Sequence, residues 1–112
     1  MSIIKHLSGK NLVVGVGNAL VDILVSESDE FLSGISDDKG GMTYVDSEFS
    51  EGVLKKTDQE AKIVPGGACC NTIVGMGKLD GNVKFIGKHG DDRLGTFFKN
   101  GLEESHVIPE LL

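Results

Sequence analysis

A few polar and glycine residues in this chain could bind a polyhydroxylated ligand. Asn18 and Asp22 interrupt an otherwise apolar stretch. A carboxylate in apolar surroundings needs hydrogen-bond donors or loses its charge, and ligand hydroxyl groups can be such donors. If residues 18–22 are extended, the alternation of side chains puts Asn18, Leu20 and Asp22 on one face. That face would offer a carboxylate and an amide beside an apolar floor, which suits a ring rich in hydroxyl groups.

The segment PGGACCNT, residues 65–72, predicts a bend without side-chain bulk. Pro65 has a fixed φ and biases the residue before it toward extended geometry, so we expect the preceding strand to end there. Gly66 and Gly67 allow backbone angles closed to other residues and let a ligand approach the main chain. Asn71 follows at the start of a helix. Asn and Asp also cap turns and helices, so spacing alone leaves both a binding and a purely structural interpretation open.

Composition excludes several classes of protein. The chain has 112 residues, of which 39% are hydrophobic and 25% charged, as is typical of one soluble globular domain. The net charge is −6 and the basic residues are scattered, which argues against nucleic-acid binding. No apolar run approaches the ~18 residues of a membrane span, and no secretory leader is evident. We therefore expect a cytoplasmic protein that binds no membrane.

The cysteines and histidines predict neither a disulfide nor a metal site. Cys69 and Cys70 are adjacent, and adjacent residues are too close for the usual disulfide geometry. The pair lacks CxxC spacing, and His6, His89 and His106 lie far apart in sequence.

The elements that would position these residues alternate between strands and helices, which predicts an α/β fold with right-handed parallel crossovers. Strands are expected at residues 11–18 with a continuation through 19–26, at 42–45, at 61–64 and at 83–88. Helices are expected at 28–35, from Ser47 with Asp46 as its cap, at 68–79, and after Asp91 or Asp92. The inward residues of the last helix are predicted to be Leu94, Phe97, Phe98 and Leu102.

Two common nucleotide-binding motifs are absent. GVGNAL, residues 15–20, has leucine where the dinucleotide fingerprint GxGxxG needs its third glycine. The phosphate-binding loop GxxxxGK[ST] also fails, because Leu79 follows Gly77-Lys78 and His89 follows Gly87-Lys88. A dinucleotide oxidoreductase is therefore disfavoured.

Three segments together resemble the N-terminal portion of the PfkB, or ribokinase-like, carbohydrate kinases: GNALVDI (17–23), PGGACCNT (65–72) and KFIGKHGDDRLGTFF (84–98). The resemblance spans nearly the whole chain and implies a three-layer α/β/α ribokinase-like fold with a partial β-strand lid at about residues 20–45. Residues 1–112 would form the substrate-binding part. The family's C-terminal half, with its anion hole, catalytic aspartate and ATP pocket, has no counterpart here.

The resemblance implies ATP-dependent phosphorylation of a sugar or nucleoside hydroxyl, with ATP and Mg²⁺ used by the complete family enzyme. This chain alone would hold neither cofactor, carry no catalytic residue and be inactive. Asp22 would accept hydrogen bonds from substrate hydroxyls, with Asn18 assisting it. The glycine pair would let the ring approach. The implied substrate-binding residues are Asn18, Asp22, Met42, Gly66, Gly67 and Asn71.

Two details point to the adenosine-kinase-like branch of that family. Ribose-specific members resemble PGGKGAN at the glycine bend, whereas Ala68 stands here in place of the lysine. GNALVDI and KGGMTYVD (39–46) look closer to adenosine kinases, in which lid residues near Met42 would cover the base. Sugar kinases stay open. So does a non-catalytic module that binds a sugar or nucleoside, or one that forms a homodimer through exposed strands.

Overall fold

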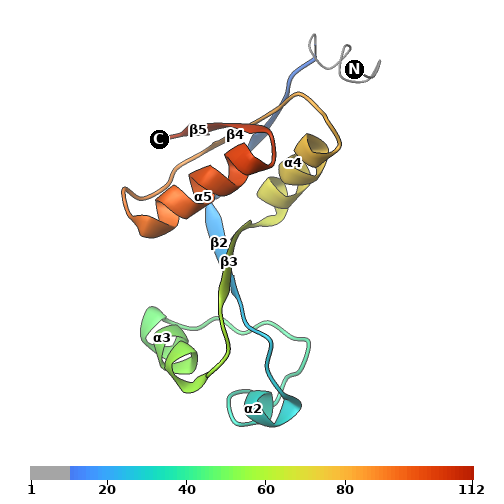
Figure 1. Ribbon diagram of the computed structural model, residues 1–112. Helices are drawn as coiled ribbons and strands as arrows, with labels where there is room; N and C mark the ends of the chain where they lie inside the picture. The colour runs from blue at the N-terminus through green and yellow to red at the C-terminus, as the bar shows by residue number, and fades with distance from the viewer. Residues whose placement is uncertain (1–10) are drawn as a thin grey trace. The chain divides into compact units, whose positions relative to one another are not determined.

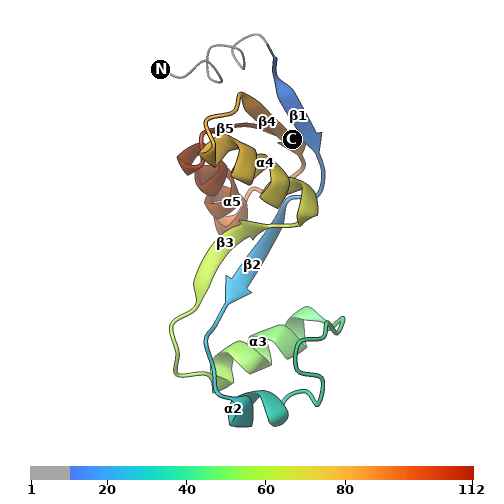
Figure 2. The same cartoon turned by 90° about the vertical axis from the view of Figure 1, so that its right-hand side faces the viewer.

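The computed structural model describes residues 11–112 and divides them into two compact units. One unit consists of residues 11–23 and 63–112, and the other is Leu24–Lys62. All fully buried hydrophobic residues among those described belong to the first unit. The hydrophobic core therefore lies in that unit, whose sheet and helices are labelled in Figures 1 and 2.

A parallel three-stranded sheet forms the centre of the first unit. Its strands are β1 (Val13–Val16), β4 (Val83–Gly87) and β5 (Val107–Leu111), in the order β1-β4-β5. Val83 is the register partner of both Val13 and Val107. Parallel neighbours need crossover connections, and α5 (Arg93–Glu104) connects β4 to β5. The α/β class expected from the sequence is confirmed.

Helices α4 (Ala68–Lys78) and α5 pack on the same face of this sheet. Cys70 and Ile73 of α4 join Phe98 and Leu102 of α5 in one buried cluster with strand residues of β4 and β5. The rings of Phe85 and Phe98 meet edge to face, with centroids 5.5 Å apart. This cluster packs α4 and α5 against β4 and β5.

The amphipathic pattern of α5 is partly confirmed. Asp92 caps the helix, because its Oδ1 accepts a hydrogen bond of 2.8 Å from the Gly95 amide. Phe98 and Leu102 are buried as predicted. Leu94 and Phe97 are instead 41% and 39% exposed, so the prediction that they face inward is wrong.

The prediction that the strand at residues 11–18 continues through residues 19–26 is also wrong. It breaks after Val16, and β2 (Leu20–Leu24) joins β3 (Lys62–Gly66) in a separate two-stranded sheet. Strand β3 continues through Pro65 instead of ending before it. Strand β5, which contains Pro109, was not predicted at all. Proline cannot donate to a ladder but is tolerated on strands with a free edge, and both strands have one among the described residues.

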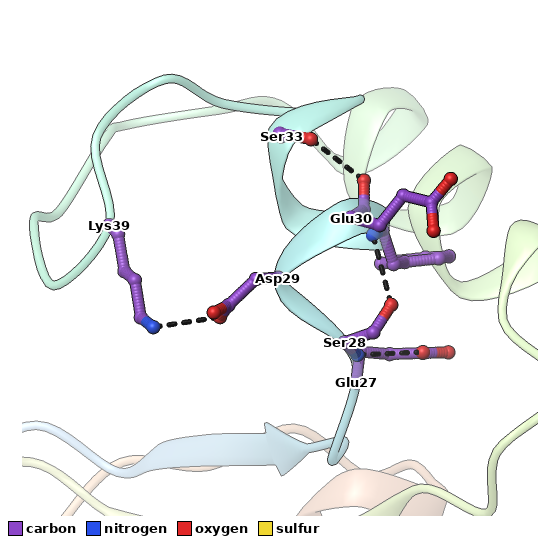
Figure 3. A network of polar contacts seen from close by, with 7 residues as sticks. Glu27, Ser28, Asp29, Glu30, Ser33 and Lys39 are labelled. Carbon is purple, nitrogen blue, oxygen red and sulfur yellow. Dashed lines mark hydrogen bonds and ion pairs between the residues drawn. The ribbon is translucent and has the colours of Figure 1, made fainter.

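The second unit contains two capped helices, α2 (Asp29–Ser33) and α3 (Ser47–Lys56), as predicted. The hydroxyl of Ser28 accepts a hydrogen bond from the Phe31 amide, and Lys39 lies 2.7 Å from Asp29 in an ion pair (Figure 3). Asp46 caps α3 through the Phe49 amide at 2.8 Å. No strand forms at residues 42–45, where one was predicted. These residues are exposed and pair with no other strand of the described chain.

Two absences hold for residues 11–112. None of their helices has the length and apolar character that a membrane crossing requires. No cluster of three His, Cys, Asp or Glu side chains in this range could hold a metal ion.

Candidate substrate-binding site

Strands β2 and β3 bring Asp22 against the backbone of Gly66. A Cβ atom at Gly66 would lie 2.6 Å from Oδ1 of Asp22 and would collide with the rest of the carboxyl group as well. Gly66 itself is buried. Only glycine therefore leaves room for the carboxylate beside the main chain. The sequence had separated these residues by more than forty positions, and the pairing of the two strands joins them.

The Asp22 side chain is exposed, which differs from the buried setting that its apolar neighbours suggested. Strand β2 belongs to a two-stranded sheet, and such a sheet leaves much of its surface in solvent. Among residues 11–112 the carboxylate accepts no hydrogen bond and forms no ion pair. Its lone pairs are therefore free to accept hydrogen bonds from a ligand.

Gly67 makes the turn from β3 into α4 and has φ of +91°, a conformation that side chains other than glycine rarely adopt. A Cβ atom there would lie 3.2 Å from Cδ1 of Leu20 and 3.6 Å from the carbonyl oxygen of Asn18. Leu20 and Asp22 thus share the face of β2 that meets the bend, as alternation predicted. Asn18 precedes β2, and it is the Asn18 carbonyl that lies near the bend.

The first turn of α4 begins at this bend. Gly67 is its N-cap residue and supplies no side-chain cap. The amide of Asn71 donates to the Gly67 carbonyl at 2.9 Å, which is the first hydrogen bond of the helix. The amides before Asn71 have no carbonyl partner within the helix. Asn71 is exposed one turn into α4, so Asn18, Asp22, Gly66, Gly67 and Asn71 gather around one bend.

The two cysteines, to which the sequence assigned no role, lie in the same turn as free thiols. The Cys69 sulfur packs against the β1 end, because a Cβ atom at Gly15 would lie 2.9 Å from it and one at Gly17 3.3 Å. Cys70 is completely buried. Burial raises the pKa of the Cys70 thiol to about 11, with smaller contributions from Cys69 and from the negative charge of Asp22. Cys70 is therefore a neutral core residue at ordinary pH.

Met42 lies in the other unit, where its side chain is 79% exposed. Its contact with a substrate stays a prediction.

Comparison of the sequence with known proteins finds one matching family and several relatives. Residues 41–111 match the model of the "pfkB family carbohydrate kinase". The probable fructokinase-2 of Arabidopsis thaliana is 32% identical over 98 residues, which cover 88% of this chain and 23% of the relative.

Two solved structures of kinases have a similar fold. A probable sugar kinase from Rhizobium etli has a TM-score of 0.75 at 29% identity, covering 88% of this chain and 29% of that one. The adenosine kinase from Sinorhizobium meliloti has a TM-score of 0.74 at 29% identity, and the match covers 90% of this chain and 31% of that one. The chain thus spans less than a third of each of these proteins. The parallel sheet, the glycine bend beside Asp22 and these matches lead to one conclusion: the chain belongs to the pfkB family of carbohydrate kinases and has their ribokinase-like α/β fold.

Proposed function

We propose that this chain forms the substrate-binding side of an ATP-dependent kinase that phosphorylates a hydroxyl group of a sugar or nucleoside. The observation that supports this most is the exposed Asp22 carboxylate, which has no partner among residues 11–112 and lies against a glycine that no other residue could replace. A fixed acceptor beside bare backbone suits a ring that carries adjacent hydroxyl groups. The family match supports the type of reaction.

In this proposal Asp22 accepts hydrogen bonds from two neighbouring hydroxyls of the substrate. Each bond to the charged group contributes about 1.5–3 kcal/mol. Leu20 packs beneath the ring, while Gly66 and Gly67 let the ring approach the main chain. Asn18 and Asn71 add polar contacts at either side. An analogue without the hydroxyls would leave the carboxylate unpaired, so it would bind much more weakly.

ATP, with Mg²⁺, supplies the transferred phosphoryl group in this proposal. The described residues do not fit a site for either of them, because no cluster among them could hold a metal ion and the chain has neither of the two common phosphate-loop motifs. No step of the transfer is therefore assigned to these residues. We propose that the chain alone is inactive and that it works in the cytoplasm.

The substrate is proposed to be a nucleoside, with Met42 covering its base, and a ketohexose such as fructose is the competing candidate. Ribose-specific members of the family resemble PGGKGAN at the glycine bend. Ala68 stands in this chain where that pattern has its lysine, so we expect ribose to bind poorly. The relatives support both candidates, since they include a probable fructokinase and an adenosine kinase.

Titrations of the isotopically labelled chain with adenosine, fructose and ribose, followed by NMR, test the binding site directly. We expect adenosine to shift the amide signals of residues 18–22 and 66–71. The variant Asp22→Asn should weaken this effect at least about tenfold, because it loses a charged acceptor.

The matched control is Glu103→Gln, which makes the same chemical change at an exposed position in α5. It should titrate like the unsubstituted chain. If Asp22→Asn binds as well as this control, Asp22 does not belong to the site. If fructose shifts these signals at lower concentration than adenosine, the nucleoside assignment is wrong and the sugar assignment replaces it.

A further inference from the structure

Helix α5 contacts the strand that leads to the glycine bend (Gly66 and Gly67) at a residue without a side chain. The ring of Pro65, in β3, lies against the backbone of Gly101, in the last turn of α5. A Cβ atom at position 101 would collide with Cγ of Pro65 and would lie 2.8 Å from its Cδ. Both residues belong to the unit that contains the hydrophobic core, and Figure 2 shows β3 leading into α4 next to α5.

The glycine at position 101 is explained by space and not by its backbone conformation. Glycine is a poor helix former, so its place inside a helix needs a reason. Among the described glycines only Gly40 and Gly67 have positive φ, so the backbone of Gly101 would accept other residues. Gly75, in α4, is the contrasting case, because a Cβ atom there would meet nothing within 4 Å. The ring of Pro65 is therefore what the glycine in α5 accommodates.

A methyl group added at position 101 would displace Pro65 and not α5. Carbon atoms in contact lie about 3.5–4.0 Å apart, so the collision is relieved only by a shift of roughly 1 Å. Phe98 and Leu102 lie on the same side of the helix as Gly101 and anchor it in the buried core. Pro65 is only half-buried and belongs to a two-stranded sheet. The strand therefore gives way before the helix does.

A shift of Pro65 reaches the ligand site through the main chain. The proline ring includes its own backbone nitrogen, so it cannot rotate away from a collision as other side chains do. Gly66 follows directly, and its buried backbone lies against the Asp22 carboxylate. Beyond the bend, the sulfur of Cys69 already packs closely against Gly15, so the bend cannot move as one piece. The separation between the backbone at Gly66 and the carboxylate would therefore change.

We infer that Gly101 is a positioning residue for the ligand site: its bare backbone seats the ring of Pro65 and thereby sets where Gly66 lies relative to the Asp22 carboxylate. This inference rests on the proposed function. Gly101 touches no ligand, and its effect on affinity is transmitted by Pro65. A ligand that donates hydrogen bonds to Asp22 while its ring rests on the Gly66 backbone needs both at a fixed separation. A displacement of about 1 Å weakens both contacts.

Titrations of the isotopically labelled chain, followed by NMR, test the inference. The ligand is whichever of adenosine and fructose binds the unsubstituted chain more tightly. Gly101→Ala should weaken its binding at least about fivefold, because the methyl group displaces Pro65. The matched control is Gly75→Ala, the same substitution in a helix where the methyl group has space. This control should bind the ligand like the unsubstituted chain.

A second substitution separates positioning from a general loss of stability. Pro65→Ala removes the Cγ and Cδ atoms, while Cβ of residue 65 lies 3.9 Å from a Cβ atom at position 101, which is an ordinary contact. The double variant Pro65→Ala/Gly101→Ala should therefore bind the ligand within about twofold of Pro65→Ala alone. Truncating Pro65 would not relieve a loss of stability that has its cause elsewhere in α5.

Two results of the titrations overturn the inference. One is equal affinity of Gly101→Ala and the unsubstituted chain. The other is a double variant that binds as weakly relative to Pro65→Ala as Gly101→Ala binds relative to the unsubstituted chain. Circular dichroism shows whether each variant is folded. If Gly101→Ala unfolds, the double variant decides, because it should fold and bind like Pro65→Ala, and its unfolding also overturns the inference.

The same titrations distinguish a failure of the inference from a failure of the proposed function. Weak binding by Asp22→Asn together with undiminished binding by Gly101→Ala would leave the proposed function intact and overturn the inference alone. If neither adenosine nor fructose binds the unsubstituted chain, the proposed function is contradicted, and the inference falls with it.

Discussion

At the scale of single residues, Asp22 and Gly66 depend on each other. The carboxylate occupies the space that any side chain at position 66 would need, and Gly67 adopts a φ of +91° immediately after it. The two cysteines that follow contribute packing rather than a ligand contact. Cys69 and Cys70 pack the first turn of α4 against β1 and the core, and so hold the bend in place.

Cys70 gives the protein a stability that depends on pH. The pKa of its thiol is raised from 9.0 to about 11, mainly because the group is buried. As pH rises above 9, the unfolded chain loses this proton while the folded chain keeps it. The contribution of Cys70 to the free energy of unfolding is therefore complete below pH 9 and is lost as pH rises toward 11.

Urea unfolding at pH 8 and at pH 10.5 measures this effect. We expect the free energy of unfolding to fall between the two conditions by more in the unsubstituted chain than in Cys70→Ala, which has no thiol to titrate. Cys69→Ala serves as the control and should retain most of the decrease, because burial, the main cause of the raised pKa of Cys70, stays in place. The same decrease in Cys70→Ala and in the unsubstituted chain would show that the buried thiol is not its source.

At the scale of elements, the packing of α4 depends on which of its glycines meets the sheet. A Cβ atom at Gly77 would collide with the Ser105 carbonyl oxygen and would lie 3.1 Å from a methyl group of Val107. A Cβ atom at Gly75 would meet nothing within 4 Å. Of these two glycines, only Gly77 packs closely against its surroundings.

This contrast predicts opposite effects for the same substitution in one helix. Gly75→Ala should stabilise the protein by roughly 0.5–1 kcal/mol, because alanine favours the helical backbone and the added methyl group has space. Gly77→Ala should destabilise it by about 1–3 kcal/mol, because the methyl group overpacks the contact with β5. Thermal unfolding of both variants checks the signs. Equal shifts in the melting temperature would mean that α4 does not approach the sheet at Gly77.

At the scale of the whole molecule, the two units differ in what stabilises them. The buried cluster belongs to the unit of residues 11–23 and 63–112. Residues 24–62 contain no fully buried side chain and carry the whole net charge of −6. Capping bonds and the Lys39–Asp29 ion pair support that unit, and such exposed pairs contribute only about 0–1 kcal/mol.

Hydrogen exchange should therefore separate the two units. We expect the amides of α2 and α3 to exchange much faster than those of β4 and α5, because local opening costs little where few apolar groups are buried. Added salt should slow exchange in residues 24–62 more than in the core, since it screens the repulsion among acidic side chains. Uniform protection across both units would contradict this account.

The sequence allowed much of this to be predicted. Alternating strands and helices indicated an α/β fold, Asp46 marked the start of α3, and the glycine bend after an apolar run indicated where a helix would begin beside β3. The family resemblance is confirmed. Which of Asp91 and Asp92 caps α5 could not be predicted, because both side chains suit the position and only the backbone geometry selects Asp92.

Local pattern by itself determined the type of most elements and the candidate residues, because periodicity, caps and glycine pairs act over a few neighbouring positions. Tertiary structure alone decided which strands pair. It split the first apolar run between two sheets, kept proline inside β3 and β5, and left Asp22 exposed at the Gly66 backbone. These outcomes depend on contacts between segments that are distant in sequence. The energies of such contacts cannot be inferred from the residues of any one short segment.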